Sequence, residues 1–260
     1  MTSAAIDEMR AANYEISQAI APEPGDSVLE LAAGVGDTGF DVAELIGDGG
    51  RLISSDFSPA MLDAARRRGS ERGVDNTEYR IIDAQRIALE DDSVDGIICR
   101  FAYMLIADPA DALVEARRVL RPGGRLVLAV WGRPEENPYF TTIVASLMRC
   151  GHRPPLEPPP APGIFTLASP ERITELLRDA GFAEVRTTGV RIRYMLRDAA
   201  TYVAIYRRHR RSARSVPPGP LRRGANATHR GPRAGAERLR QRRGLRRSRT
   251  RTVRDGELTP

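Results

Sequence analysis

Short apolar runs alternate with segments of helical spacing from residue 27 to residue 130, and this alternation restricts the possible folds more than any other feature. Strands are predicted over residues 27–32, 51–55, 78–82, 94–99 and 125–130. Repeated strand–helix alternation with short loops predicts a parallel sheet that is covered by helices on both faces. The expected fold class is therefore α/β, with a doubly wound, mostly parallel sheet. Ligands of such sheets bind beyond the carboxyl ends of the strands.

Helix signals lie between and after these strands. Apolar spacing and capping residues predict helices over residues 38–46, 58–68, 109–120 and 169–180. Proline stands in the first turn of the last three, as is typical of a helix start. A further strand-like segment follows over residues 183–195.

The charge of the chain is divided unevenly. Its net charge of +6 suggests a nucleic-acid binder until the charges are located, and all 40 basic residues are arginine. Residues 207–260 hold 18 of these arginines against three acidic residues, whereas the first 206 residues hold 22 arginines and 31 acidic residues. We therefore expect an acidic globular body, residues 1–206, followed by a basic tail, residues 207–260.

The tail has the composition of a disordered segment. It contains no aromatic residue and few large apolar ones, so it cannot bury enough surface to offset the entropy lost on ordering. The sequence predicts no strand in the tail.

Within the body, residues 133–168 interrupt the strand–helix pattern. An amphipathic stretch from Tyr139 to Met148 is followed by a cluster of prolines from residue 154 to residue 162. This insertion follows a central strand and is predicted to cover a substrate, or else to be a surface excursion without function.

Individual residue types exclude several classes of protein. Cys99 and Cys150 form no disulfide framework, and Cys99 lies in an apolar run where a buried thiol is usual. The three histidines show no metal-ligand spacing, so no metal site is expected. No apolar stretch is long enough to span a membrane, and residues 1–20 lack the pattern of a signal peptide. A cytoplasmic protein is therefore expected.

The sharpest local motif is Gly34-Val35-Gly36-Asp37-Thr38-Gly39, which follows a predicted strand and precedes a predicted helix. Glycines there let the backbone turn tightly and approach a ligand closely, next to a helix N-terminus. Asp56 ends the next strand, where a carboxylate either accepts the ribose hydroxyls of an adenosine or caps the following helix. NAD and S-adenosylmethionine are both candidate ligands. Glu30 favours the second, because dinucleotide folds keep apolar residues in this strand and a carboxylate suits the ammonium of an amino acid.

Four segments in order resemble the motifs of class I S-adenosylmethionine-dependent methyltransferases: VLELAAGVGDTGF (28–40), ISSDFSPAMLDAAR (53–66), IIDAQRIALEDDSVDGIICRF (81–101) and ALVEARRVLRPGGRLVLAVW (112–131). In detail the chain is similar to the ubiquinone/menaquinone-biosynthesis-type branch of small-molecule methyltransferases, over about residues 5–200. The resemblance implies a Rossmann-like methyltransferase fold with S-adenosyl-L-methionine as cofactor. The implied reaction is transfer of a methyl group, by in-line displacement, to a small apolar or aromatic acceptor.

The resemblance also implies that the residues contacting the cofactor lie at the carboxyl ends of the first four strands. They are Glu30, Ala32, Gly34, Gly36, Asp56, Phe57, Met61, Asp83, Ala84, Arg100 and Phe101. Glu30, Gly34 and Gly36 would hold the methionine end, and Asp56 would take the ribose hydroxyls. Met61 would pack near the adenine, or belong to the core instead.

The remaining implied contacts surround the adenine edge and the methyl group. Asp83 and Ala84 would lie at the adenine edge, with Asp83 near the exocyclic amine. Arg100 and Phe101 would flank the methyl-donor pocket, although Arg100 alternatively pairs with a surface carboxylate and Phe101 alternatively packs in the core. Segment 3–20 would form a helix over the cofactor.

No residue is assigned as catalytic, because the sulfonium of the cofactor already activates the methyl group. A base is needed only for an acceptor that must lose a proton. Tyr103, His152 and Tyr14 are the candidates for this role.

The tail departs from the family pattern. The family's fold closes with a hairpin whose last, apolar strand is slotted antiparallel into the sheet, and no apolar run follows residues 183–195 here. One explanation is a functional basic tail that binds nucleic acid or anionic surfaces. The other is a shift of reading frame near residues 205–210, which we favour because a genuine appended tail would leave the final strand in place. The C-terminal strand is therefore expected to be missing.

Two functions of other classes stay open. An NAD-dependent oxidoreductase would use the same glycine motif, although Glu30 argues against it and the absence of lysine excludes Tyr-Lys chemistry. A nucleic-acid-binding protein would act through the arginine-rich tail. Nucleic acid is expected as a partner only if the tail is genuine, and no oligomeric state is predicted.

Overall fold

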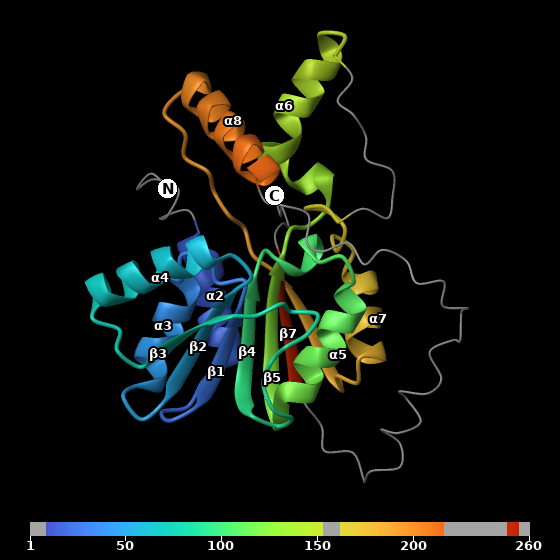
Figure 1. Ribbon diagram of the computed structural model, residues 1–260. Coiled ribbons are helices and arrows are strands. Elements are labelled where there is room, and N and C mark those ends of the chain that lie inside the picture. The colour runs from blue at the N-terminus through green and yellow to red at the C-terminus, as the bar shows by residue number, and fades with distance from the viewer. Residues whose placement is uncertain (1–8, 153–161, 216–248, 255–260) are drawn as a thin grey trace, which may run out of the picture. The chain divides into compact units, whose positions relative to one another are not determined.

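The structure is a computed structural model that describes residues 9–152, 162–215 and 249–254 (Figure 1). The chain divides into two compact units. The first comprises Met1–Tyr194 and Arg247–Pro260 and contains the whole sheet. The second comprises Met195–Arg246 and contains helix α8 (Ala199–Ser215).

Seven strands form one sheet in the order β3-β2-β1-β4-β5-β7-β6, and their pairings are parallel. The strands are β1 (Ser27–Leu31), β2 (Arg51–Asp56), β3 (Thr77–Ile81), β4 (Val94–Arg100), β5 (Leu120–Val130), β6 (Glu184–Gly189) and β7 (Arg249–Arg254). The predicted α/β class with a parallel sheet is confirmed. The strand order reverses between β1 and β4, so the loops at their carboxyl ends border the crevice where such sheets bind ligands.

Helices cover both faces of the sheet (Figure 1). They are α2 (Arg10–Ile20), α3 (Asp37–Ile46), α4 (Pro59–Arg72), α5 (Pro109–Val119) and α7 (Pro170–Asp179). Helix α6 (Pro138–Arg149) covers neither face and projects beyond the carboxyl edge of the sheet. α2, α3 and α4 contribute to one core cluster, and α5 and α7 contribute to the other. Alternate strand residues divide between the two clusters: in β1, Val28 belongs to the first and Leu29 to the second. We call the two sides of the sheet the α3 face and the α5 face.

The local signals of the sequence account for these elements. All five residues of β1 are buried, because helices cover the strand from both sides. α5 begins after Asp108, whose side chain accepts hydrogen bonds from the backbone N–H groups of Ala110 and Asp111. α7 begins in the same way after Ser169, which accepts from the N–H of Arg172. The predicted helices are thus confirmed in α3, α4, α5 and α7.

Two predictions near the end of the body are wrong. The strand predicted over residues 183–195 ends at Gly189, because Val190, Ile192 and Tyr194 pack against the core clusters without pairing to a neighbouring strand. Disorder was predicted from residue 207, whereas α8 continues to Ser215. Alanine and arginine are strong helix formers, so a segment with few apolar residues still forms this helix.

The prediction that the tail contains no strand is also wrong. β7 lies between β5 and β6 and pairs with both. It is parallel to them, unlike the antiparallel apolar strand that the family resemblance implied. Its Thr250, Thr252 and Val253 are β-branched and favour strands, but they alternate with other residues and form no apolar run. Residues 216–248 and 255–260 lie outside the described residues.

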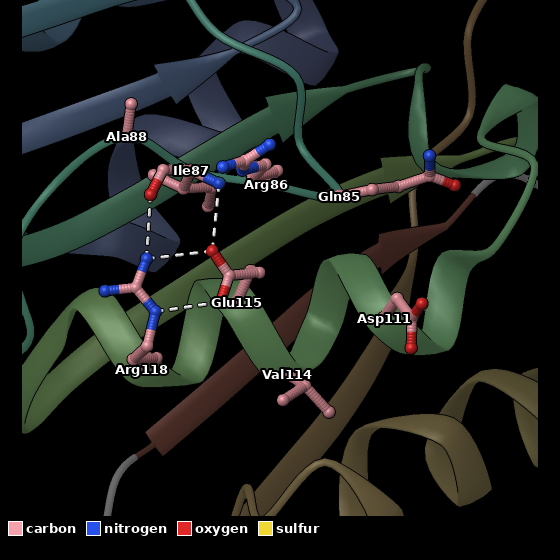
Figure 2. A pocket seen from close by; sticks show the side chains of 8 residues that line it. All are labelled: Gln85, Arg86, Ile87, Ala88, Asp111, Val114, Glu115 and Arg118. Carbon is pink, nitrogen blue, oxygen red and sulfur yellow. Dashed lines mark hydrogen bonds and ion pairs between the residues drawn. The ribbon is translucent and has the colours of Figure 1, made fainter. Parts of the chain in front are cut away.

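Arg118 of α5 fixes the loop that joins β3 to β4. All five N–H groups of its guanidinium donate hydrogen bonds, at 2.7–2.9 Å. Two go to the Glu115 carboxylate and the others to the carbonyl oxygens of Ile87 and Leu89 and to Asp91. Figure 2 shows the contacts with Glu115 and Ile87, whose own N–H donates to Glu115 at 2.9 Å.

This network also changes the acidity of its members. Hydrogen bonding between the two side chains raises the pKa of Arg118 and lowers the pKa of Glu115. The loop is thereby held against α5. Since the loop starts at the carboxyl end of β3, Arg118 indirectly positions Asp83 and Ala84.

We expect Arg118→Met to lower the free energy of unfolding by about 2–4 kcal/mol, because it removes the charged partner of the Glu115 carboxylate and leaves two loop carbonyls without a side-chain donor. Arg118→Lys should recover less than half of this loss, since an ammonium offers three donors from one atom. Urea denaturation followed by circular dichroism measures both changes.

The matched control is Arg172→Met, which removes an exposed ion pair with Glu175. It should change the free energy of unfolding by less than about 1 kcal/mol. An Arg118→Met protein as stable as the control would mean that the loop keeps its place without the guanidinium.

Candidate functional site

The loop of residues 32–36 carries the chain from β1 into α3. Ala32, Gly34 and Gly36 have positive φ angles of 53°, 59° and 85°. Glycine adopts this backbone freely, whereas Ala32 does so at a cost of roughly 1–2 kcal/mol. The N–H of Gly34 donates to the Asp56 carboxylate, so the loop is tied to the end of β2.

Glu30 is buried beneath this loop, with 3% of the residue exposed. Its Oε1 accepts from the N–H of Gly39 at 2.8 Å, and its Oε2 accepts from the Ser54 hydroxyl at 3.2 Å. A Cβ atom at Gly39 would overlap Oε2, so this position requires glycine. Burial raises the pKa of Glu30 to about 7, although the Gly39 hydrogen bond and the charge of Arg100 oppose this change. Glu30 links β1, β2 and α3, and its direct contact with a ligand stays a prediction.

Asp56 closes β2 beside the same loop and is also buried. Its Oδ2 accepts from the N–H of Gly34 and its Oδ1 from the N–H of Ser58, each at 2.9 Å. The second bond is a local turn onto Ser58, the N-cap residue of α4, and α4 has no side-chain cap hydrogen bond, so the alternative that Asp56 caps this helix is wrong. A carboxylate offers about four lone-pair positions, so two are left for ribose hydroxyls. Binding of the ribose stays a prediction.

Three apolar side chains around Asp56 are exposed: Phe57 at 53%, Met61 at 45% and Ile81 at 63%. Ile81 is paired with Asp56 in the register of β2 and β3. The Asp56 carboxylate and these three apolar side chains together fit a nucleoside, whose ribose carries hydroxyl groups and whose flat base is largely apolar. The exposure of Met61 excludes its alternative role in the core. The sequence did not point to Ile81 as a site residue. Adjacent residues of a strand face opposite sides, so one of Ile81 and Ile82 had to be exposed, and Ile82 is the buried one.

Asp83 and Ala84 follow β3 in the loop that Arg118 holds. Asp83 is exposed and accepts from the N–H of Gln85 at 2.9 Å, while Ala84 packs against the core. An open pocket lies farther along, between residues 85–88 and α5 (Figure 2). No predicted site residue lines this pocket, so we do not assign the cofactor to it.

Six aromatic side chains form a chain of contacts that starts beyond the carboxyl ends of β4 and β5, and we call them the aromatic cluster. They are Phe101, Trp131, Tyr139, Phe140, Phe165 and Tyr194. Phe101 and Trp131 stack with their ring centroids 4.1 Å apart, and Phe140 meets Trp131 edge-on at 4.7 Å. Tyr139 and Tyr194 stack at 3.7 Å. Except for Phe101, the sequence analysis did not assign these residues to the site.

The backbone of Phe101 is strained. Its φ of 55° is an outlier for a bulky residue, and such residues gather at functional sites. The stack on Trp131 and a hydrogen bond from the Phe101 N–H to the Ala129 carbonyl, at 2.8 Å, hold it in place. Arg100, the residue before it, is half-buried at the end of β4.

α2 lies against the start of α3. The Thr38 hydroxyl donates to Oδ1 of Asn13 at 3.0 Å, and both residues are buried. This helix is part of the predicted segment 3–20, of which residues 3–8 lie outside the described residues. Tyr14, which follows Asn13, is 63% exposed, and its role as a base stays a prediction.

The structure removes one candidate base and separates another from the site. Tyr103 is buried in the core and donates its hydroxyl to the Ala112 carbonyl at 3.2 Å, and burial raises its pKa well above the usual value. The prediction for Tyr103 is therefore wrong. His152 is exposed beyond the far end of α6, about 20 Å along the helix from Pro138. The structure does not bring it to the aromatic cluster.

Two kinds of feature are absent from the described residues. No three His, Cys, Asp or Glu side chains within them are grouped so as to hold a metal ion. None of the described helices combines the length and apolar character that crossing a bilayer requires.

The sequence matches a family model described as the ubiE/COQ5 methyltransferase family over residues 6–144. It is 37% identical over 118 residues to the demethylmenaquinone methyltransferase of Clavibacter sepedonicus, a match that covers 45% of this chain and 46% of that protein. It is 35% identical over 115 residues to the ubiquinone/menaquinone biosynthesis C-methyltransferase UbiE of Teredinibacter turnerae, covering 44% and 46%. The chain thus spans about half the length of these curated relatives.

Solved structures share the fold. A SAM dependent methyltransferase from Aquifex aeolicus aligns with a TM-score of 0.53 at 21% identity, covering 68% of this chain and 83% of that one. A putative methyltransferase in complex with the Haloferax volcanii Trm112 methyltransferase activator aligns with a TM-score of 0.53 at 22% identity, covering 75% and 77%. The expected Rossmann-like methyltransferase fold is confirmed.

We expect Ala32→Gly to raise the free energy of unfolding by about 1 kcal/mol, because glycine relieves the positive φ and the exposed alanine side chain packs against little. Ala33→Gly is the matched control. Ala33 is buried and has no positive φ, so its replacement should lower the free energy of unfolding by about 1 kcal/mol. Urea denaturation of both variants measures the difference, and a loss of stability in Ala32→Gly would contradict the strain.

Glu30 makes stability depend on pH. Its pKa is raised from 4.5 to about 7 in the fold, so between these values the folded state holds a proton that the unfolded state has lost. The resulting stabilisation is fully present below pH 4.5 and is lost as the pH rises to about 7. Glu30→Gln removes this titration and keeps an acceptor for Gly39. The free energy of unfolding of the variant minus that of the wild type should therefore rise by about 3 kcal/mol as the pH is raised from 4.5 to about 7.

Urea titrations at a series of pH values measure this difference. Glu175→Gln on α7 replaces an exposed carboxylate and is the matched control. Its difference from the wild type should vary by less than about 0.5 kcal/mol. A constant difference for Glu30→Gln would contradict the effect of burial on this carboxyl group.

Proposed function

The chain belongs to the ubiE/COQ5 methyltransferase family, and from this premise we propose that it transfers a methyl group from S-adenosylmethionine to a small-molecule acceptor. Members of this family use S-adenosylmethionine, the cofactor that the sequence predicts. The observation that carries the proposal is that the family match, residues 6–144, contains both the loop of residues 32–36 and Asp56.

The proposed reaction asks the chain to bind and orient two molecules. The cofactor, when bound, supplies a methyl group on a sulfonium that is already a good leaving group. The loop of residues 32–36 allows close approach of the backbone, and Asp56 keeps free lone pairs for ribose hydroxyls. Phe57 and Met61 offer apolar surface to the base. Holding the acceptor in line with the methyl group can contribute about 7–11 kcal/mol to catalysis.

The acceptor that we propose is small and apolar or aromatic. The aromatic cluster begins at Phe101, which the family resemblance implies to lie beside the methyl group. Aromatic rings bind flat apolar ligands through burial and stacking. The relatives are named for demethylmenaquinone and for ubiquinone/menaquinone biosynthesis, and a quinone ring is an acceptor of this kind.

Residues 133–168 are proposed to cover this acceptor, within a methyltransferase domain of residues 1–206 whose sheet also includes β7. Helix α6 in this segment has no buried residue, yet its Tyr139 and Phe140 belong to the aromatic cluster. A cover of this kind keeps water away from the reacting atoms. The proline cluster of the segment lies mainly outside the described residues.

A proton acceptor is part of the proposal only for an acceptor molecule that must lose a proton. Tyr103 lies in the core and His152 lies beyond α6, so Tyr14 is the remaining candidate among the three.

Calorimetric titration of the purified chain with S-adenosylhomocysteine tests the proposal. We expect binding at one site with micromolar affinity, and no binding of NADH, which an NAD-dependent oxidoreductase would bind. Asp56→Asn should weaken the binding of S-adenosylhomocysteine about 10- to 100-fold, because the ribose hydroxyls lose a charged acceptor.

Asp63→Asn is the matched control, since Asp63 is an exposed carboxylate on α4. Circular dichroism shows whether each protein is folded. A folded wild type that binds NADH, or neither ligand, would overturn the proposal. A titration with single-stranded RNA at several salt concentrations tests the remaining alternative, because binding through an arginine-rich tail weakens steeply with salt.

A further inference from the structure

Arg100 lies where the two central strands reach the crevice. It is the last residue of β4, and Leu31, the last residue of β1, is paired with Cys99 just before it. Arg100 is therefore beside the point at which the loop of residues 32–36 leaves β1. Strand alternation puts it on the α3 face, because Ile98 belongs to the core cluster of that face and Cys99 to the other.

The surroundings of Arg100 contain a buried carboxyl group that does not pair with it. Glu30 lies on the same face, and the charge of Arg100 lowers the pKa of its carboxyl group. The two Glu30 oxygens are nevertheless bound to Gly39 and Ser54. Within residues 9–152, 162–215 and 249–254, no hydrogen bond or ion pair joins the Arg100 guanidinium to another residue.

Other arginines of this part of the fold are paired. Arg68 forms an ion pair with Asp37, and Arg72 binds both Asp41 and Glu44. A half-buried guanidinium has lost part of its hydration, and an unpaired charge in such a place is unfavourable. The arrangement at Arg100 is thus complete only with an anion from outside the described residues.

The chemistry of the cofactor limits which of its groups this anion can be. S-adenosylmethionine has one anionic group, the carboxylate of its amino acid, and two cationic ones, the ammonium and the sulfonium. A guanidinium next to the sulfonium would be repelled in a site of low dielectric constant. A guanidinium next to the carboxylate would bind it through two parallel hydrogen bonds.

We propose that Arg100 binds the α-carboxylate of S-adenosylmethionine and so distinguishes the cofactor from adenosine derivatives that lack this group. The proposal rests on the proposed function. It replaces the expectation that Arg100 flanks the methyl group, and it makes Arg100 a binding residue that acts at the amino-acid end of the cofactor.

Two ligands that differ in one group provide the test. Calorimetry measures the affinity of the full chain for S-adenosylhomocysteine and for its decarboxylated analogue, which keeps the adenosine, the sulfur and the amino group. The wild type should prefer S-adenosylhomocysteine about 10- to 100-fold. Arg100→Met should weaken binding of S-adenosylhomocysteine to the level of the analogue and leave the analogue's affinity within about twofold. Arg100→Lys should retain part of the preference.

Arg178→Met, at an exposed position on α7, is the matched control and should keep the full preference. A folded wild type that binds neither ligand overturns the proposed function and this inference with it. A wild type that binds both ligands equally, or an Arg100→Met protein that keeps the preference, overturns the inference alone. Equal weakening of both ligands by Arg100→Met also overturns it, because that result indicates a structural role.

Discussion

The ligand edge of the sheet depends on one buried carboxylate. Glu30 joins β1, β2 and α3 through two hydrogen bonds, and a carboxylate in such a place is tolerated only when its oxygens have donors. This requirement determines the neighbouring residues: a hydroxyl at Ser54, and no side chain at Gly39. With the loop held above Glu30, the N–H of Gly34 reaches Asp56. The ends of β1 and β2 are thus fixed relative to each other before any ligand is considered.

The two sides of the crevice are stabilised by different kinds of interaction. On the side of β3, two backbone carbonyls and the Asp91 carboxylate of the connecting loop accept hydrogen bonds from Arg118, so that one charged group sets the course of the chain. On the side of β5, stacking of the uncharged rings of Phe101, Trp131 and their neighbours holds the chain in place. The half that we assign to a nucleoside combines the Asp56 carboxylate with exposed apolar side chains such as Phe57, whereas the half that we assign to an acceptor is lined by aromatic rings.

Features with a local signal were predictable from the sequence, and features made by distant segments were not. The buried runs of β1, β2 and β4, the glycine motif and the capping residue of α7 each lie within a few neighbouring residues. The aromatic cluster instead joins Trp131 to Phe165 and Tyr194, which only tertiary packing brings together. Tyr103 was a candidate base, but its side chain packs in the core and its hydroxyl donates to a carbonyl of α5, which only tertiary packing determines. β7 was missed because its partners lie far away in the chain.

That distance has a consequence for synthesis. β5 ends at Val130 and β7 begins at Arg249, so a ribosome adds about 120 residues between the two strands. At a rate of about 5–20 residues per second, β5 waits on the order of ten seconds with one edge unpaired. An apolar strand edge that is open for so long can pair with another nascent chain. In the complete sheet both edges of β5 are paired, but during synthesis one is open. The yield of folded protein in cells should therefore depend on chaperones and on the rate of translation.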